Sequence, residues 1–128
     1  MKPLFAAMLI SLGHVTSGPG EVAEVPIVIE TDGQCVVDIE TVIESDIPVD
    51  IVIEGPHVLS FLRMDGPNRY RVEFEASGCP NGEVAKIGFV LPGNAQGTYR
   101  LRLVHAALRI ESGDLIETRS KNGQVKVQ

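Results

Sequence analysis

Apolar and polar residues alternate along most of this chain with the two-residue period of a β-strand. In RYRVEFEA, residues 69–76, the alternation predicts a buried face of apolar side chains and a solvated face of charged ones. The buried side is Tyr70, Val72, Phe74 and Ala76, and the solvated side is Arg69, Arg71, Glu73 and Glu75. One side of this strand therefore faces a core and the other faces water.

Two further segments repeat the pattern. In TYRLRLV, residues 98–104, it places Tyr99, Leu101 and Leu103 inside, with Arg100 and Arg102 outside. In CVVDIETVI, residues 35–43, the residues that share one face are Val37, Ile39, Thr41 and Ile43. Because each such strand supplies only half of a core, two sheets are expected to pack face to face.

The predicted fold is an all-β, two-sheet antiparallel β-sandwich of about nine strands, of jelly-roll or immunoglobulin-like type. Short β-branched runs bounded by Gly, Pro, Asn or Asp give the strands: Val22–Ile29, Cys35–Ile43, Val49–Ile53, His57–Arg63, Arg69–Ala76, Glu83–Leu91, Thr98–Val104, Leu108–Ile110 with Leu115–Thr118, and Gly123–Val127. Pro26 marks the first strand as an edge or as bulged, since proline donates no amide hydrogen. Only VLSFLRM, residues 58–64, has a weak helical pattern.

The first 18 residues have the layout of a secretory signal peptide. Lys2 precedes the apolar run Leu4–Leu12, and small residues follow at Thr16–Gly18. Cleavage is expected near Ser17 or Gly18, which assigns residues 1–18 to the signal and residues 21–128 to the domain. The alternatives are an N-terminal strand or a membrane anchor. The signal interpretation predicts a secreted, extracellular protein.

Composition narrows the classes of function. The 128 residues, 44% hydrophobic and 22% charged, suffice for one globular domain. A formal net charge of −6 argues against nucleic-acid binding, which needs clustered Lys and Arg. No apolar run reaches the roughly 20 residues that a membrane-spanning helix requires.

Cys35 and Cys79 are the only cysteines, and neither belongs to a Cys-x-x-Cys pair. In an oxidising compartment they would form a disulfide that closes a loop of about 45 residues and stabilises the domain by roughly 3 to 4 kcal/mol. Two free thiols are the alternative.

The sequence offers no catalytic residue, metal site or cofactor site. His14, His57 and His105 are scattered, and no metal-binding, nucleophile or phosphate-binding motif is present. Acidic residues alternate outward along strands instead of converging on a cleft. The chain has no Trp to stack against a sugar, and alternation assigns both of its tyrosines, Tyr70 and Tyr99, inward. We therefore expect a non-enzyme.

The order of elements resembles the cohesin family of β-sandwich modules. The similarity lies in GEVAEVPIVIE, in VVDIETVIESDIPVDIVIE, and in VAKIGFVLPGNAQGTYRLRLVHAALRIESGDLIETRSKNGQVKV. The resemblance implies a last strand that pairs near the first and completes the sandwich. It also implies a protein-binding function, because cohesins take up dockerin modules on one face of a sheet.

The resemblance therefore suggests a secreted binding module for a dockerin-type partner in a polysaccharide-degrading or cell-surface assembly. A carbohydrate-binding module that takes polysaccharide, and a structural extracellular domain without a specific ligand, are the alternatives. The candidate partner-binding face consists of six charged residues, provided that their strands are neighbours: Arg69, Arg71, Glu73, Glu75, Arg100 and Arg102. An ordinary solvated face is the other interpretation of the same residues.

Overall fold

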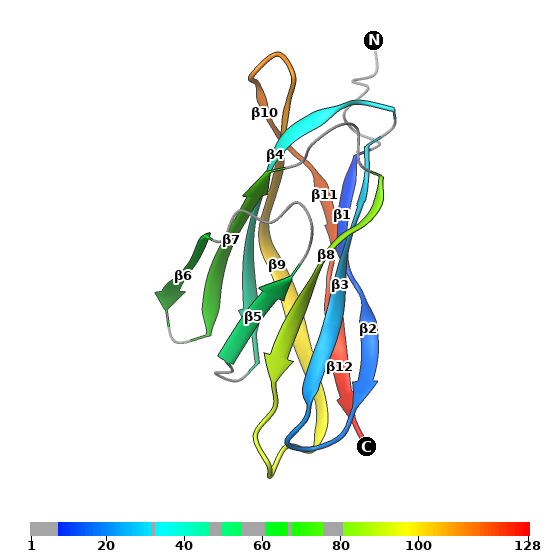
Figure 1. The fold of residues 1–128 in the computed structure, drawn as a ribbon, viewed down its shortest axis with the longest axis vertical. Helices are drawn as coiled ribbons and strands as arrows, with labels where there is room; N and C mark the ends of the chain where they lie inside the picture. The colour runs from blue at the N-terminus through cyan, green and yellow to red at the C-terminus, as the bar shows by residue number, and fades with distance from the viewer. Residues whose placement is uncertain (1–7, 32, 47–49, 55–60, 67, 76–80) are drawn as a thin grey trace.

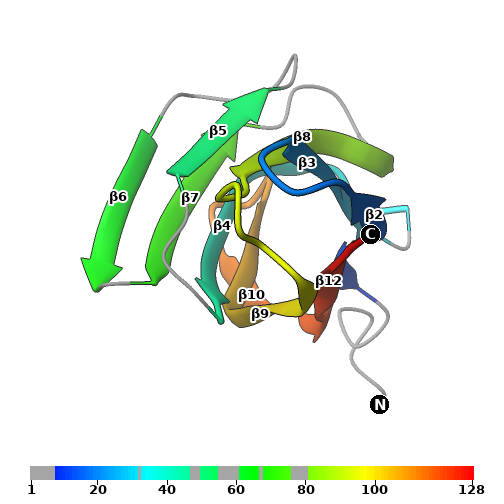
Figure 2. The same cartoon turned by 90° about the horizontal axis from the view of Figure 1, so that it is seen from below.

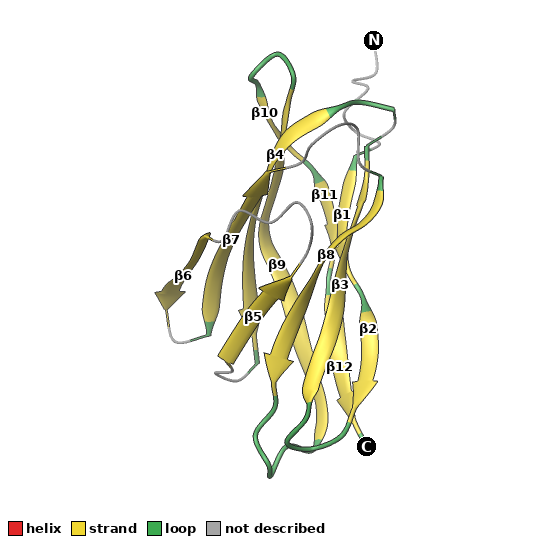
Figure 3. Cartoon of the chain, in the orientation of Figure 1, coloured by secondary structure: helices red, strands yellow, loops and turns green. Residues whose placement is uncertain are grey.

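The structure, a computed structural model, describes residues 8–31, 33–46, 50–54, 61–66, 68–75 and 81–128. These residues form twelve strands, and none of them is helical (Figure 3). No helix in this part of the chain is long and apolar enough to cross a membrane.

The strands form two sheets that pack as a sandwich, which confirms the predicted fold class (Figure 1). The first sheet has five strands in the order β11 (Arg119–Lys121), β1 (Leu9–Leu12), β3 (Val22–Glu30), β8 (Gly82–Val90) and β5 (Asp50–Glu54). The second, seven-stranded sheet has the order β2 (His14–Ser17), β12 (Gly123–Val127), β9 (Gly97–Ile110), β4 (Val36–Ser45), β7 (Arg69–Glu75) and β6 (Phe61–Gly66), with β10 (Leu115–Glu117) paired to β9.

The core lies between the inner faces of the two sheets. Ile27 and Ile87 from the five-stranded sheet, and Ile43 and Leu108 from the other, have no exposed surface. Burying a side chain of this size contributes about 1.5 to 3 kcal/mol. Tyr70 is also buried and Tyr99 packs against the core, as the alternation predicted.

The N-terminal and C-terminal strands run side by side and close one side of the sandwich (Figure 2). β1 pairs with β11 in one sheet and β2 pairs with β12 in the other. Both pairings are parallel, whereas the other strand pairings of the described residues are antiparallel, as predicted. We call these four strands the terminal seam.

The terminal seam corrects the predicted domain boundary. Residues 9–17, which the sequence analysis assigned to a signal peptide, form β1 and β2. Met8 and Ile10 are fully buried and Leu12 nearly so, and all three belong to the core cluster. An apolar run followed by small residues fits a signal peptide and an inward-facing strand equally well. The sandwich thus begins before Glu21, and the prediction of secretion, which relied on this segment, stays a prediction.

The chain passes from one sheet to the other twice in the terminal seam, at Gly13 between β1 and β2 and at Gly123, where β12 begins after β11. The Gly13 N–H donates to the Pro26 carbonyl at 3.0 Å, and the Gly13 carbonyl accepts from the Gln124 N–H at 3.2 Å. A Cβ on Gly123 would lie 2.5 Å from the Gly13 carbonyl oxygen and 2.7 Å from the Leu12 Cβ. The two backbones can therefore approach this closely only without a side chain.

Pro26 lies where the crossing occurs. The register of β3 against β8 shifts between Ile27 and Val28, so the strand is bulged near Pro26. The pairing of β3 with β1 covers only residues 27–30, so Pro26 also lies where that side of the strand becomes an edge. The Pro26 carbonyl faces Gly13, and the N–H and C=O of one strand residue point the same way. An N–H at position 26 would therefore point to where β1 ends. Its absence in proline costs no hydrogen bond of the ladder.

Three other details differ from the sequence predictions. Val37 is 38% exposed, because the register of β4 against β9 shifts between Val36 and Asp38 and turns Val36 inward instead. Residues 61–64 of the proposed helical turn lie in β6, while residues 58–60 are outside the described residues. The segments predicted separately around residues 98–104 and 108–110 form one strand, β9.

Cys35 takes part in a disulfide. Cys79 lies outside the described residues, so its pairing with Cys35 stays a prediction.

Removal of residues 1–17 tests the terminal seam. We expect the protein that begins at Gly18 to lose cooperative unfolding, because it lacks three core side chains and leaves β12 without its parallel neighbour. Urea unfolding followed by circular dichroism measures this. A truncated protein that unfolds at the wild-type midpoint would contradict the assignment of these residues to the sandwich, and would favour a cleaved leader.

Gly123→Ala tests the crossing of the two strands. We expect a loss of about 1 to 3 kcal/mol in the free energy of unfolding, since the new methyl group would overlap the backbone at Gly13. Gly93→Ala is the matched control, because no atom lies within 4 Å of the position that its Cβ would take. Equal stabilities of the two variants would show that the close approach is not limiting.

Candidate partner-binding face

The outer face of the seven-stranded sheet carries charged residues on three adjacent strands, β7, β4 and β9. β4 lies in the middle and pairs with both neighbours, so that Glu44 stands between Arg69 and Arg102, and Asp38 between Glu75 and Arg109. We define the charged face by these residues: Asp38, Glu40, Glu44, Arg69, Arg71, Glu73, Glu75, Arg102, His105 and Arg109.

Alternation along β4 and a bulge in β9 produce this face. Ile39, Thr41 and Ile43 of β4 point inward, so Asp38, Glu40 and Glu44 lie on the outer side, where Val42 is only 5% exposed among them. The buried Thr41 hydroxyl donates to the Val72 carbonyl of β7 at 3.0 Å, which satisfies a polar group on the inner side.

β9 keeps its apolar residues inside only because its register shifts by one residue. Val42 pairs with His105 while Ile43 pairs with Leu103, so Val104 is the extra residue and is 46% exposed. The shift turns Ala106 and Leu108 inward and His105 outward. A strict two-residue period would have placed His105 in the core.

Two arginines bind Glu44 at one end of the charged face. Arg69 Nη2 lies 2.6 Å and Arg102 Nη2 3.0 Å from the Glu44 carboxylate oxygens. Arg102 also donates through Nη1 to Asp46 at 3.0 Å, and the Arg100 backbone N–H donates to the same carboxylate at 2.8 Å. The three strands are thereby joined by side chains as well as by the backbone ladder.

This network borders an open depression of about 370 Å³. Its lining residues come from the ends of β4, β6 and β9 and the turn before β7: Glu44, Ser45, Asp46, Gly66, Asn68, Arg69 and Arg102. The turn is fixed by the Ser45 N–H, which donates to the Asn68 carbonyl at 3.0 Å.

These hydrogen bonds and ion pairs shift the pKa values of Glu44, Asp46 and Arg102. Hydrogen bonds from Arg69 and then Arg102 lower the pKa of Glu44, and the Arg100 backbone N–H is the main cause of the lowered pKa of Asp46. The same contacts with Glu44 and Asp46 raise the pKa of Arg102. All of these groups are therefore charged at neutral pH.

The other end of the charged face is more acidic. Asp38 pairs with Arg109 at 3.3 Å and Glu40 with His105 at 3.7 Å, while Glu73 lies 3.8 Å from Arg71. His105 carries a charge only when protonated. We call the end with Asp38, Glu40, Glu73 and Glu75 the acidic half of the charged face, which also holds His105 and Arg109. The end with Arg69, Arg71 and Arg102 is the basic half, which also holds Glu44.

The structure brings together most of the residues that the sequence analysis proposed. Arg69, Arg71, Glu73 and Glu75 point outward on β7 and Arg102 points outward on β9, but these strands are not neighbours. Arg100 is exposed at the end of the face, where its backbone binds Asp46.

β4 lies between β7 and β9, and the sequence analysis missed its acidic residues. Asp38 and Glu40 alternate with the inward Ile39, so the signal was present in the sequence. Neighbouring strands could not be known from it, however, because strand order is a property of the fold.

The described residues offer little for other kinds of site. They contain no group of three or more His, Cys, Asp or Glu residues that could hold a metal ion. His14 is exposed in β2 and contacts the Asn122 carbonyl at 3.3 Å, whereas His57 is outside the described residues. The Tyr99 hydroxyl accepts a hydrogen bond from the Gln96 N–H at 3.1 Å.

Comparison with known proteins gives matches among solved structures. No family model and no curated protein sequence matches the chain. The sixth cohesin of scaffoldin B from Acetivibrio cellulolyticus, solved with a dockerin, superimposes with a TM-score of 0.78 at 13% identity, covering 95% of this chain and 99% of that one.

Two further cohesins agree. One from Clostridium thermocellum, in a type I cohesin–dockerin complex, gives a TM-score of 0.77 at 14% identity, covering 95% of this chain and 99% of that one. The non-cellulosomal cohesin from the archaeon Archaeoglobus fulgidus gives 0.73 at 17% identity, with 96% and 92% covered. These likenesses establish the fold: the chain is a cohesin-like β-sandwich, as the resemblance predicted.

The dependence of stability on pH tests the network. Because the folded-state pKa values of Glu44 and Asp46 are lowered, their contribution to stability is present above the ordinary carboxyl pKa of about 4 and is lost as pH falls through the folded values. The double variant Glu44→Gln/Asp46→Asn should therefore melt below the wild type at pH 7, and this difference should disappear on acidification toward about pH 2.

Thermal melts at a series of pH values measure the difference. Glu117→Gln removes another exposed carboxylate and should leave the melting curve unchanged at every pH. A difference between wild type and the double variant that stays constant with pH would contradict the network's role.

Proposed function

We propose that this chain is a non-catalytic protein-binding module that docks a dockerin-type partner on the charged face. The observation that carries the proposal is the arrangement of that face: ten charged or titratable side chains on three adjacent strands of a rigid sheet. Support comes from the fold, since solved neighbours of the same fold are cohesins in complex with dockerins.

Ion pairs prepare the charged face for a macromolecular partner. Arg69 and Arg102 form ion pairs with Glu44, so these two long side chains are already ordered before a partner binds. Binding affinity gains when such ordering is completed before the partner arrives. The open depression beside them could receive one protruding side chain of the partner.

The separation of charges on the face indicates what the partner presents. The partner should bring cationic side chains over the acidic half and an acidic or neutral surface over the basic half. Complementary potentials of this kind mainly raise the association rate and the specificity of a complex. Val104 lies on the same strand as Arg102 and is 46% exposed, so it offers the partner an apolar contact between the charges.

A polysaccharide ligand has less support. Sugar-binding sheets use exposed aromatic side chains, and here Tyr70 is 2% exposed and Tyr99 is partly buried against the core. The proposed setting, an extracellular assembly that degrades polysaccharide or decorates a cell surface, rests on the resemblance to cohesins.

Affinity capture tests the binding function. The full chain is immobilised and exposed to the secreted proteome of its source, with calcium and then with a chelator. We expect a dockerin-bearing protein, identified by mass spectrometry, to bind in calcium and to elute with the chelator. Capture of no such protein, together with binding to insoluble polysaccharide, would favour the carbohydrate-binding alternative; failure of both would leave a structural domain.

Charge reversal tests the location of the site. Arg71→Glu combined with Arg102→Glu should weaken the captured partner's binding about tenfold or more, because it reverses the basic half. Lys126→Glu is the control for added negative charge, on an exposed residue of β12. Surface plasmon resonance gives both affinities, and melting temperatures show whether each variant is folded. Equal binding by the double variant and the control would place the site elsewhere.

A further inference from the structure

The outer face of the five-stranded sheet has a different chemistry from the charged face. Val22 of β3, Val52 of β5 and Val90 of β8 are 52%, 52% and 36% exposed, and they lie on three adjacent strands. They are half of the six large hydrophobic residues that are exposed in the described part of the chain. We call these three residues, with Gly88 between them, the valine patch.

The valine patch is continuous across the three strands. Val22 pairs with Val90, and Val52 pairs with Gly88. A Cβ on Gly88 would lie 3.0 Å from Val22 Cγ1 and 3.9 Å from Val52 Cβ, so a valine borders the glycine on each side. A shallow depression of about 50 Å³ lies here, lined by Val22, Glu24, Val52, Lys86 and Gly88.

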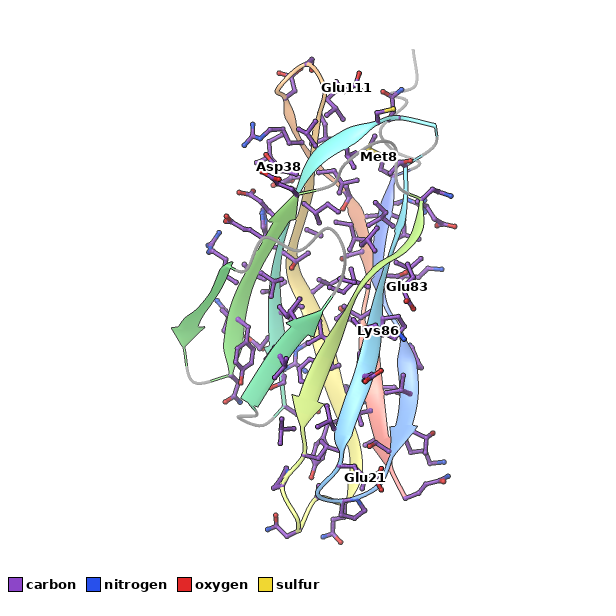
Figure 4. The ribbon with its side chains drawn as sticks, viewed as in Figure 1. Met8, Glu21, Asp38, Glu83, Lys86 and Glu111 are labelled. Carbon is purple, nitrogen blue, oxygen red and sulfur yellow. The ribbon has the colours of Figure 1, made fainter. Side chains whose placement is uncertain are left out.

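One acidic and one basic residue lie beside this depression. The Glu24 and Lys86 side chains are 61% and 50% exposed, and their charged atoms are 4.0 Å apart. Figure 4 shows Lys86 and Glu83 along β8, on the sheet opposite to that of Asp38. An exposed pair at this distance is weak in water, so both groups can take other partners.

We infer that the valine patch is the interface of a homodimer. A two-fold axis near the Glu24–Lys86 pair would place Glu24 of each copy against Lys86 of its partner and bring the valines of both copies together. A surface that carries both charges beside an apolar centre is complementary to itself, which a two-fold interface requires. Two sheets can pack in this way, face to face, as they do within a sandwich.

This arrangement has a consequence for function. The charged face is on the opposite sheet, so a dimer through the valine patch leaves both charged faces open and pointing away from each other. Such a dimer would bind two partner molecules at once. Where several partner molecules are attached to one surface, the dimer would bind that surface more tightly than a monomer would. The inference itself does not depend on the proposed function.

Sedimentation velocity of the full chain tests the dimer. Because three valines and one ion pair make a small interface, we expect a reversible monomer–dimer equilibrium over about 10 μM to 1 mM. Val52→Lys should shift the protein to monomer throughout this range. Val104→Lys, at a valine of similar exposure on the other sheet, should dimerise like the wild type. A wild-type protein that is monomeric throughout, or a dimer that Val52→Lys leaves intact, would overturn the inference.

A charge swap tests the two-fold arrangement. Glu24→Lys and Lys86→Glu should each weaken the dimer at least about tenfold, because each places like charges opposite one another. An equimolar mixture of the two variants should form a heterodimer, in which both pairs are again opposite in charge. Melting temperatures confirm that each variant is folded. Failure of the mixture to recover the dimer would contradict contact between Glu24 and Lys86 across the axis.

Discussion

The close crossing of two strands at Gly13 and Gly123 is the constraint on which the structure depends. At this point the chain passes from β1 to β2 and from β11 to β12, and thus from one sheet to the other. A side chain on Gly123 would collide with the backbone of Gly13. Because of this crossing, the same two segments of the chain form the paired strands at one side of both sheets. Parallel pairing on both sides of the crossing then holds the two layers in a fixed relation.

With one side closed by the terminal seam, the rest of each sheet presents a flat outer surface. β4 is central in the seven-stranded sheet and joins β7 to β9 through Glu44, so that its outer surface is rich in ordered charge. β8 is flanked by β3 and β5 in the other sheet, and its Gly88 lets neighbouring valines close over it. The sandwich therefore carries a charged outer surface and a partly apolar outer surface on opposite sides of one core.

Much of this fold could be predicted from the alternation of apolar and polar residues. A strand with one buried and one solvated face requires that alternation. The rule failed at Val37, and a strict two-residue period would also have misplaced His105, because a bulge leaves no clear mark in the sequence. It also failed at Leu9–Ser17, because an apolar run with small residues fits both a signal peptide and a strand. Charges on β7 and β9 were predicted, but the strand between them was not, because strand order depends on the whole chain.

We propose that the charged face of the seven-stranded sheet binds a protein. The most direct test of this proposal is to record amide chemical shifts of the isotope-labelled chain before and after addition of the dockerin-bearing protein. We expect the largest changes along β4, β7 and β9, at residues such as Glu40, Arg71 and Arg102. Changes concentrated on β3 and β8, with the charged face unaffected, would contradict the proposal.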